Sequence, residues 1–183
     1  MRKIVSGLFI SLDGVIENPN EWTGQYFSPQ VGQAVGSMIA AQDAMLLGRV
    51  TYDEFAAYWP HQTDDDMAST MNGTRKYVVS GSLTSADWQN TTLIPRDRYV
   101  AEVAELKQGS GKNIGMTGSA TLVAALLREG LLDELHLIVF PLVLGTGKRL
   151  FNGNGNGGGQ LPLTLIGSET FDNGVVHLTY AKA

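Results

Sequence analysis

The apolar residues of this chain are grouped in short runs, and these runs alternate with stretches in which apolar positions recur at helical spacing. Short apolar runs are typical of buried β-strands, and helical spacing is typical of amphipathic helices. The alternation predicts an α/β fold with a mostly parallel sheet. We expect strands at residues 3–12, 44–47, 76–80, 113–116 and 135–140, a short strand within 86–94, and helices at 28–42, at 98–108, from Thr51 onward and between Thr121 and Gly130.

Several residues have the types that begin or end helices. Ser28 and Pro29 suit an N-cap and the first helical position, and Gly130 suits the position just after a helix. Thr51 and Glu54 match a capping box, which gives Thr51 a purely structural interpretation. We therefore expect helices that begin at residues 28 and 51 and one that ends at residue 130.

The last part of the chain predicts an antiparallel hairpin. Asp172-Asn173-Gly174 is a tight-turn signal between apolar runs at residues 163–171 and 175–180. Residues 60–72 and 152–159 have the composition of loops; three consecutive Asp in the first could bind a divalent cation, although a solvated loop is the simpler interpretation. Without a repeat or a linker, residues 1–183 are expected to form a single domain.

Composition narrows the class of function. The 183 residues carry a net charge of −5, which argues against general binding to nucleic acid or to an anionic membrane. The chain has no Cys, which excludes disulfides and thiolate chemistry and fits a cytoplasmic protein. No apolar run reaches the length of a membrane span. We expect a globular cytoplasmic protein whose partner is a small molecule.

Small and hydroxylated residues follow three of the predicted strands, and they are the main candidates for binding a ligand. Ligands of open α/β sheets collect at the carboxyl ends of the strands, and helix N-termini there offer free N–H groups to phosphate. Thr117 or Ser119 could instead simply cap the following helix. The candidate residues are Gly48, Arg49, Val50 and Thr51 after the second strand, Ser80, Gly81 and Ser82 after the third, and Thr117, Gly118, Ser119, Ala120 and Thr121 after the 113–116 strand.

Arg49 is the charged residue among these candidates. A cation beside the positive end of a helix is unfavourable unless an anion lies between them. A bound phosphate could be that anion, and so could the nearby carboxylates of Asp53 or Glu54. The residue types therefore leave both a ligand contact and an internal ion pair open.

Other familiar chemistry finds no support in the sequence. The segment around Lys148 does not match a phosphate-binding P-loop, and Gly145-Thr146-Gly147 does not continue into a dinucleotide-binding glycine pattern. His61, His136 and His177 are far apart along the chain and have no metal-ligand spacing, so we predict no metal site and structural roles for the last two. Hydride transfer remains attractive because the cofactor supplies most of its chemistry.

The order of motifs resembles the dihydrofolate-reductase-like fold and, within it, the riboflavin-biosynthesis reductase (RibD C-terminal domain) family. The resemblance covers nearly the whole chain; each motif is weak alone, and their order and spacing are specific. The matching segments are residues 11–15 (SLDGV), 47–52 (LGRVTY), 79–82 (VSGS), 118–122 (GSATL), 130–135 (GLLDEL), 141–147 (PLVLGTG) with Leu150-Phe151, and 172–176 (DNGVV).

This resemblance implies a central mixed, mostly parallel sheet flanked by helices, with NADPH across the strand ends. Arg49 would bind the adenosine 2′-phosphate, Ser80 to Ser82 would line the adenosine side, and Gly118 to Thr121 would hold the pyrophosphate. Asp13 and Trp22 would face the substrate, with Asp13 as a proton relay or hydrogen-bond partner. Many members of such families are homodimers.

The chain also departs from the pattern of the families that it resembles. Dihydrofolate reductases carry an acid on the first long helix, whereas residues 29–42 contain none. Riboflavin-pathway reductases commonly have Glu-Gly-Gly where this chain has Thr117-Gly118-Ser119, and they bring Arg residues to a ribose phosphate where residues 53–60 have none. The fold and cofactor are therefore expected to carry over better than the substrate.

We arrive at the hypothesis of an NADPH-dependent reductase of a small heterocycle, of the type that reduces 5-amino-6-(5-phosphoribosylamino)uracil. Another carbonyl, imine or pterin-like substrate remains open, and so does a nucleotide-binding module without turnover. Asp13 also has a structural interpretation, as an Asp-Gly turn. Trp22 could stack on a ring or merely anchor its loop.

Overall fold

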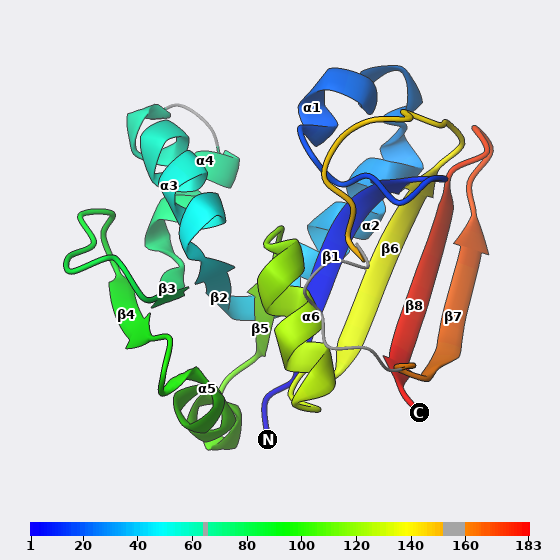
Figure 1. Ribbon diagram of the computed structural model, residues 1–183. Coiled ribbons are helices and arrows are strands. Elements are labelled where there is room, and N and C mark those ends of the chain that lie inside the picture. Colours follow the sequence, from blue (N-terminus) through cyan, green and yellow to red (C-terminus); the bar gives the residue numbers. More distant parts are fainter. Residues whose placement is uncertain (64–65, 152–159) are drawn as a thin grey trace.

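The computed structural model describes residues 1–63, 66–151 and 160–183, which form one eight-stranded sheet flanked by helices (Figure 1). The strands are β1 (Ile4–Ser11), β2 (Gln42–Gly48), β3 (Arg75–Ser80), β4 (Thr91–Pro95), β5 (Asn113–Met116), β6 (Glu134–Phe140), β7 (Leu163–Thr170) and β8 (Val176–Lys182). The helices are α1 (Pro19–Trp22), α2 (Pro29–Ala40), α3 (Arg49–Tyr58), α4 (Asp66–Gly73), α5 (Tyr99–Gln108) and α6 (Ala120–Arg128), with short 3-10 turns η1 (Gly24–Tyr26) and η2 (Trp59–His61).

The strand order is β4-β3-β2-β5-β1-β6-β8-β7. The first six strands of this order, from β4 to β6, run parallel, and β8 pairs antiparallel with both β6 and β7. The predicted fold class, a mostly parallel mixed sheet that ends in an antiparallel hairpin, is confirmed. In the described ranges, no helix is long and apolar enough to span a membrane.

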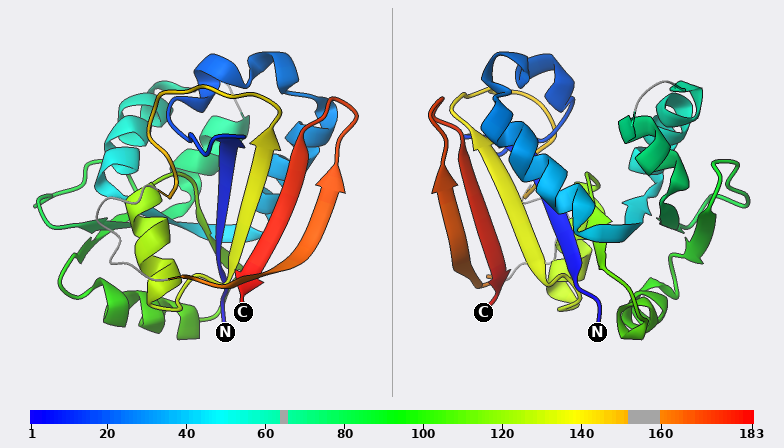
Figure 2. Two further views of the ribbon diagram at one scale, coloured as in Figure 1. Left: turned by 45° about the vertical axis from the view of Figure 1, so that its right-hand side comes forward. Right: turned by 180° about the vertical axis from the view of Figure 1, so that it is seen from behind.

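Alternating side chains along β1 divide the core between the two faces of the sheet. Ile4, Leu8 and Ile10 pack with α5 and α6 on one face. The opposite face carries two separate apolar clusters, one under α3 and α4 and the other under α2. Viewed from behind, α2 and the α3–α4 pair stand on the same side of the sheet with the central strands between them (Figure 2).

Most expected elements are present, and the differences have local causes. Ser28 caps α2 through a hydrogen bond from the Val31 amide, and Gly130 follows α6 with a φ of 67°, both as predicted. Residues 66–73 are helical rather than loop, because Ala68 and Met71 are buried against the sheet. The β6 run is less fully buried than its apolar sequence suggests, and in the described ranges no helix lies over the β8–β7 end of the face toward α6 (Figure 2). Residues 64–65 and the predicted loop at 152–159 lie outside the described residues.

Lys76 is a fully buried cation at the start of β3. Its ammonium donates hydrogen bonds to three backbone carbonyls, those of Asn72 (3.0 Å), Thr74 (2.7 Å) and Gln89 (3.1 Å), and it lies 4.1 Å from the centre of the Trp88 ring. Burial lowers the pKa of Lys76 to about 8. Lys76 therefore joins the end of α4 to the segment that leads into β4.

Replacement of this ammonium should destabilise the fold. In Lys76→Met the stem still fills the space, but three carbonyls lose their donor, so we expect the free energy of unfolding in urea to fall by about 2 kcal/mol. Arg75→Met, at the exposed neighbouring position, is the matched control and should change it by less than about 0.5 kcal/mol. Equal stability of Lys76→Met and wild type would show that the carbonyls do not depend on Lys76.

Candidate functional site

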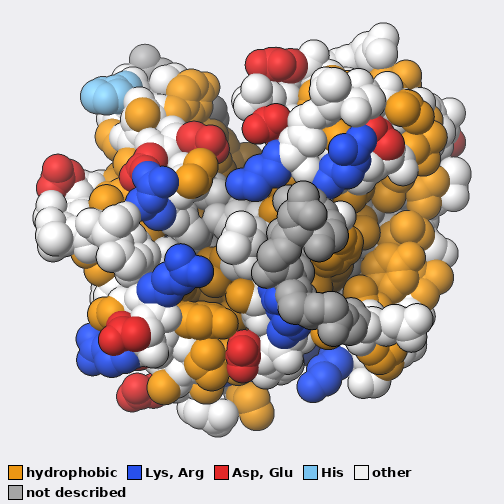
Figure 3. Space-filling view, viewed as in Figure 1, with side chains coloured by type: hydrophobic (Ala, Val, Ile, Leu, Met, Phe, Trp, Pro, Cys, Tyr) orange, Lys and Arg blue, Asp and Glu red, His pale blue; other side chains and the backbone are white. Residues whose placement is uncertain are grey.

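A cleft of about 1960 Å³ lies between α2 on one side and α3 with α4 on the other, above the middle strands of the sheet. Its floor includes Val5, Gly7 and Phe9 of β1, which point away from the α6 face. The space-filling view shows the recess between the two lobes, with basic side chains on both of its sides (Figure 3). The cleft is thus built where the two apolar clusters of this face leave the sheet uncovered.

Each of the three turns predicted from the sequence lines this cleft. β2, β3 and β5 run parallel and end at the same edge, so the residues that follow them meet there. The lining includes Gly48, Arg49, Val50, Thr51, Ser80, Gly81, Ser82, Thr117, Gly118, Ser119, Ala120 and Thr121.

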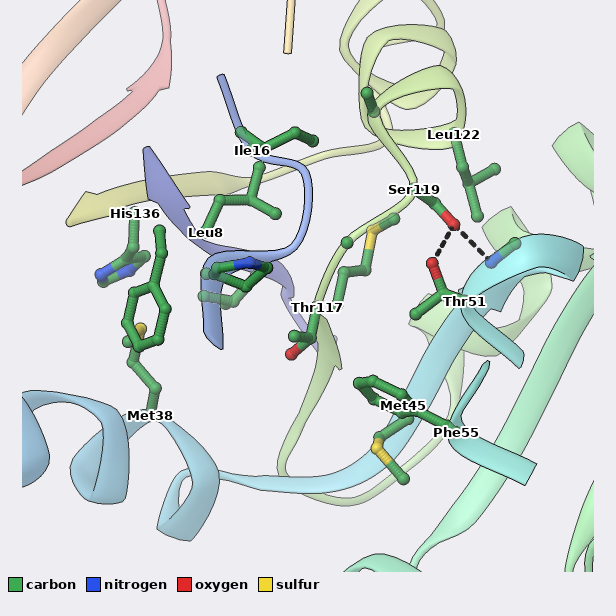
Figure 4. Close-up of a pocket in the computed structure, with 18 of the residues that line it drawn as sticks. Leu8, Ile16, Met38, Met45, Thr51, Phe55, Thr117, Ser119, Leu122 and His136 are labelled. Atoms are coloured by element: carbon green, nitrogen blue, oxygen red, sulfur yellow. Dashed lines mark hydrogen bonds between the residues drawn. The ribbon is translucent and has the colours of Figure 1, made fainter. Parts of the chain in front are cut away.

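The hydroxyl of Ser119 ties two of these turns together. Its oxygen accepts a hydrogen bond from the Gly48 amide at 3.0 Å and lies 2.9 Å from the Thr51 hydroxyl (Figure 4). Ser119 has a φ of 60°, a left-handed conformation that side chains other than Gly, Asn or Asp seldom adopt. Backbone of this kind is maintained only where its surroundings favour it, and such positions cluster at functional sites.

Two glycines make this close approach possible. A Cβ on Gly48 would lie 2.3 Å from the Ser119 oxygen, and a Cβ on Gly118 would lie 3.0 Å from the Thr51 oxygen. Gly118 also has a φ of 81°, which favours glycine. The small residues predicted for phosphate binding are therefore required first of all for the contact between the two turns.

The capping interpretations that the sequence left open for Thr51 and Ser119 do not hold in the structure. α3 begins at Arg49 with Gly48 as its N-cap, so Thr51 lies within the first turn and its hydroxyl bonds to Ser119 instead of forming a capping box with Glu54. Ser119 precedes α6 but makes no side-chain cap to it. The contact across the cleft edge has replaced both local caps, which leaves the first amides of the two helices without side-chain partners from these residues.

Cations line the cleft at this same edge. Arg49 forms an ion pair with Asp53, four residues along α3, at 2.6 Å, so the internal pairing left open by the sequence does occur. Arg96 lies beside the second turn, since a Cβ on Gly81 would be 3.5 Å from its Cβ. In the described part of the chain the Arg96 guanidinium has no hydrogen-bond or ion-pair partner. Arg96 was not predicted from the sequence, because it follows β4 rather than a Gly-rich turn.

Asp13 and Trp22 are held in other contacts and are not among the residues that line the cleft. The Asp13 carboxylate accepts hydrogen bonds from the Ser11 hydroxyl (2.7 Å), the amides of Leu144 (3.1 Å) and Gly145 (2.9 Å), and Arg149 (3.1 Å). These bonds hold the pKa of Asp13 well below its usual range, because they favour the charged form. The geometry thus favours the structural interpretation of Asp13, as an anion that fastens residues 142–149 to the end of β1.

Trp22 likewise serves as an anchor. Its indole N–H donates to the carbonyl of Glu17 at 2.8 Å, and its ring packs edge-on against Phe140, with ring centres 5.5 Å apart. This arrangement matches the alternative in which Trp22 fixes its loop.

Sequence reasoning missed a polar cluster at the α2 end of the cleft. His136 and His177, on the adjacent strands β6 and β8, lie with Nδ1 of the first 3.0 Å from Nε2 of the second. Nε2 of His136 is 3.2 Å from Glu134, which also binds Lys3 at 2.7 Å. Met38 of α2 lies beside His136 and above Gly7, whose Cβ would be 3.0 Å from the Met38 sulfur (Figure 4). The sequence analysis predicted structural roles for the two histidines but did not bring them together, because strand pairing joins positions distant in sequence.

Comparison with known proteins agrees with this architecture. The family model described as the RibD C-terminal domain matches residues 2–177. The chain belongs to the RibD C-terminal domain family. Two uncharacterised proteins of Bacillus subtilis (strain 168) are each 31% identical to it: YyaP, over 98% of this chain and 94% of its own, and YwjB, over 100% and 99%.

Solved structures related to the RibD C-terminal domain share the fold. A Shewanella sp. PV-4 protein named for riboflavin biosynthesis has a TM-score of 0.77 at 23% identity, covering 100% of this chain and 99% of its own. A pyrimidine reductase-like protein from Corynebacterium diphtheriae has a TM-score of 0.68 at 13% identity, covering 100% and 92%. A Thermotoga maritima protein named as a deaminase and 5-amino-6-(5-phosphoribosylamino)uracil reductase has a TM-score of 0.69 at 12% identity. The match covers 100% of this chain and 57% of that longer protein.

The anchoring role of Asp13 predicts a pH-dependent loss of stability. A carboxyl whose pKa is lowered by folding stabilises the native state at pH values above its unfolded pKa, about 4, and this stabilisation is lost as the pH falls below that value. We expect Asp13→Asn to lower the melting temperature at pH 7. The difference from wild type should shrink as the pH is lowered from 5 toward 2, in thermal melts followed by circular dichroism. A difference that does not change with pH would contradict a role for the Asp13 charge.

Proposed function

We propose that this RibD C-terminal domain protein is an NADPH-dependent reductase of a small nitrogen heterocycle. The observation that carries the proposal is the convergence of the three strand-end turns, with Arg49 and Arg96, on one cleft. Membership of the family supports a reductase, and the solved structures with this fold include one named pyrimidine reductase-like and one named as a 5-amino-6-(5-phosphoribosylamino)uracil reductase.

The residues at this edge suit a phosphorylated dinucleotide. The helices α3 and α6 both begin here, and their first N–H groups and positive dipole ends favour a pyrophosphate. Gly48 and Gly118 bring the backbone close, and a guanidinium suits a 2′-phosphate through paired hydrogen bonds. The cleft, at about 1960 Å³, exceeds the roughly 300–1,000 Å³ of most single-ligand pockets, so it has room for a cofactor and a substrate.

In this proposal the nicotinamide supplies the hydride, and the protein binds and orients both reactants. Gly48 to Thr51 and Gly118 to Thr121 hold the pyrophosphate, and Ser80 to Ser82 line the adenosine side. The substrate lies toward β1 and α2, where Phe9, Met38 and Ile138 form an apolar wall. Such an enclosure excludes water from the reacting carbon.

The names of the solved relatives suggest the class of substrate, but α2 lacks an acid that could bind it. The C. diphtheriae and T. maritima proteins are named for pyrimidine compounds, so we propose a pyrimidine or pterin-like substrate. α2 supplies no acid to bind it, since residues 29–40 contain neither Asp nor Glu. A homodimer remains a proposal; exposed Leu165 and Ile166 on β7 are consistent with a partner on that strand.

Cofactor binding and turnover test the proposal directly. NADPH fluorescence should change on titration with the protein, and NADPH oxidation should accelerate with at least one compound in a panel of aminopyrimidines, pterins and small carbonyl compounds. Tight NADPH binding without turnover on any member would instead support a nucleotide-binding module. Absence of NADPH binding would refute the reductase.

Substitution of the two arginines tests how the phosphates are held. Arg49→Ala and Arg96→Ala should each raise the Kd for NADPH about tenfold while NADH binding changes little, because only NADPH carries the 2′-phosphate. Asp53→Asn is the matched control, since it frees Arg49 from its ion pair and should not weaken NADPH. Equal losses for both cofactors in either Arg variant would remove that residue from the 2′-phosphate role.

A further inference from the structure

The α2 end of the cleft has polar chemistry unlike that of the turn edge. Glu134, His136, Glu169 and His177 line it, and the facing helix α2 has no charged residue. Lys3, the residue before β1, contributes a cation to this cluster, because its ammonium donates a hydrogen bond to Glu134. Arg49, Arg96 and Lys148 line the cleft elsewhere.

When both rings are neutral, the hydrogen bonds of the cluster determine which nitrogen of each imidazole carries hydrogen. Burial opposes ionisation of Glu134, but hydrogen bonds from Lys3 and His136 outweigh it and hold the pKa of Glu134 below its usual value. Ionised Glu134 can only accept, so Nε2 of His136 donates to it at 3.2 Å. In neutral His136, Nδ1 is then an acceptor. It receives the Nε2–H of His177 at 3.0 Å and the Thr179 hydroxyl at 3.3 Å.

The chain of donors ends on one free nitrogen. Because Nε2 of His177 carries hydrogen, Nδ1 of the neutral ring is a bare acceptor. This atom has no protein partner among the described residues, and His177 lines the cleft. The carboxylate–imidazole–imidazole series thus presents a fixed acceptor to whatever enters this end.

The surroundings of His177 favour its neutral form. Burial lowers its pKa, and a charge on His136 would lower it further, while Glu169 on β7 opposes the change. The groups around it are His136 and Glu134 on β6, Glu169 on β7, Thr179 on β8, and the uncharged residues of α2. Nδ1 of His136 and Nε2 of His177 are 3.0 Å apart, so the two imidazoles cannot both become cations without strong repulsion.

We propose that this end of the cleft is a subsite for an uncharged group that donates a hydrogen bond, an N–H or O–H of a heterocycle, to Nδ1 of His177. Carboxylates Glu134 and Glu169 disfavour an anionic group here. The subsite deepens the proposed function, on which it rests for the identity of its occupant as the reductase substrate. The proposed subsite requires that the substrate bind with an amino or lactam edge toward β8. Any phosphate of the substrate must then lie outside this end of the cleft.

Two matched uracils test the subsite: 6-aminouracil, which offers neutral donors, and orotate, which carries a carboxylate at the same ring position. In calorimetry with wild-type protein at pH 7.5, 6-aminouracil should bind more tightly than orotate. Its affinity should hold at pH values above 6.5, the ordinary pKa of an imidazole, and fall only below it, because burial lowers the pKa of His177 and the protonated ring no longer accepts; an anion-binding site would instead strengthen orotate at the lower pH.

Variants at position 177 separate the hydrogen bond from the fold. His177→Phe should weaken 6-aminouracil about tenfold, and His177→Gln, whose amide oxygen can accept, should retain more of the affinity. His61→Phe removes the exposed imidazole on η2 and should change nothing. Circular dichroism confirms folding, and two-dimensional NMR of the ¹⁵N-labelled imidazoles should show Nδ1 of His177 without hydrogen at pH 7.5.

Preference for orotate, no measurable binding of either uracil, an Nδ1–H tautomer at His177, or unchanged affinity in His177→Phe would each overturn the subsite. NADPH binding is measured in the same samples. If NADPH binds but the His177 variants have no effect, the subsite fails and the reductase stands. If NADPH does not bind and 6-aminouracil behaves as expected, the reductase fails and the subsite stands.

Discussion

The contact between Ser119 and the β2–α3 turn is the constraint on which the cleft depends. It joins the Gly48 amide and the Thr51 hydroxyl to a residue held at positive φ, and it leaves space for no side chain at Gly48 or Gly118. Because the two turns end neighbouring parallel strands, one hydroxyl sets the distance between the starts of α3 and α6. The spacing of two sets of helix N–H groups is thereby fixed before any ligand arrives.

The two ends of the cleft differ because different strands of the sheet supply the side chains that line them. At the turn edge, backbone amides and guanidinium groups create a positive environment. Beneath α2, side chains from β6, β7 and β8 supply carboxylates and imidazoles. Gly7 allows Met38 to lie close to β1, which closes the floor between these regions. In the proposed function, a ligand that spans the cleft would pass from the turn edge, which holds its anionic groups, across an apolar floor to the α2 end, which accepts its hydrogen-bond donors.

Sequence periodicity was sufficient for the individual strands, most helices and the three turns, because each of these depends on residues close together in the chain. It was not sufficient for contacts that strand pairing creates. The residues around Thr51 match a capping box, but its hydroxyl bonds instead to Ser119, 68 positions away in the chain. The histidine pair, separated by 41 positions, was invisible because β6 and β8 become neighbours only in the folded sheet. Arg96 was missed for the same reason, since its proximity to Gly81 arises from the pairing of β3 with β4.

The central position of β1 has a consequence for biosynthesis. Ile4 pairs with Ile114 and Leu8 with Leu137, so both neighbours of this apolar strand are encoded far downstream. A nascent chain that emerges from the ribosome only as far as β4 carries β1 with two unsatisfied edges. Long-range parallel pairing is slow to form and exposes such edges to aggregation. Chaperone contact with the amino-terminal segment during translation would protect the strand until β5 and β6 appear.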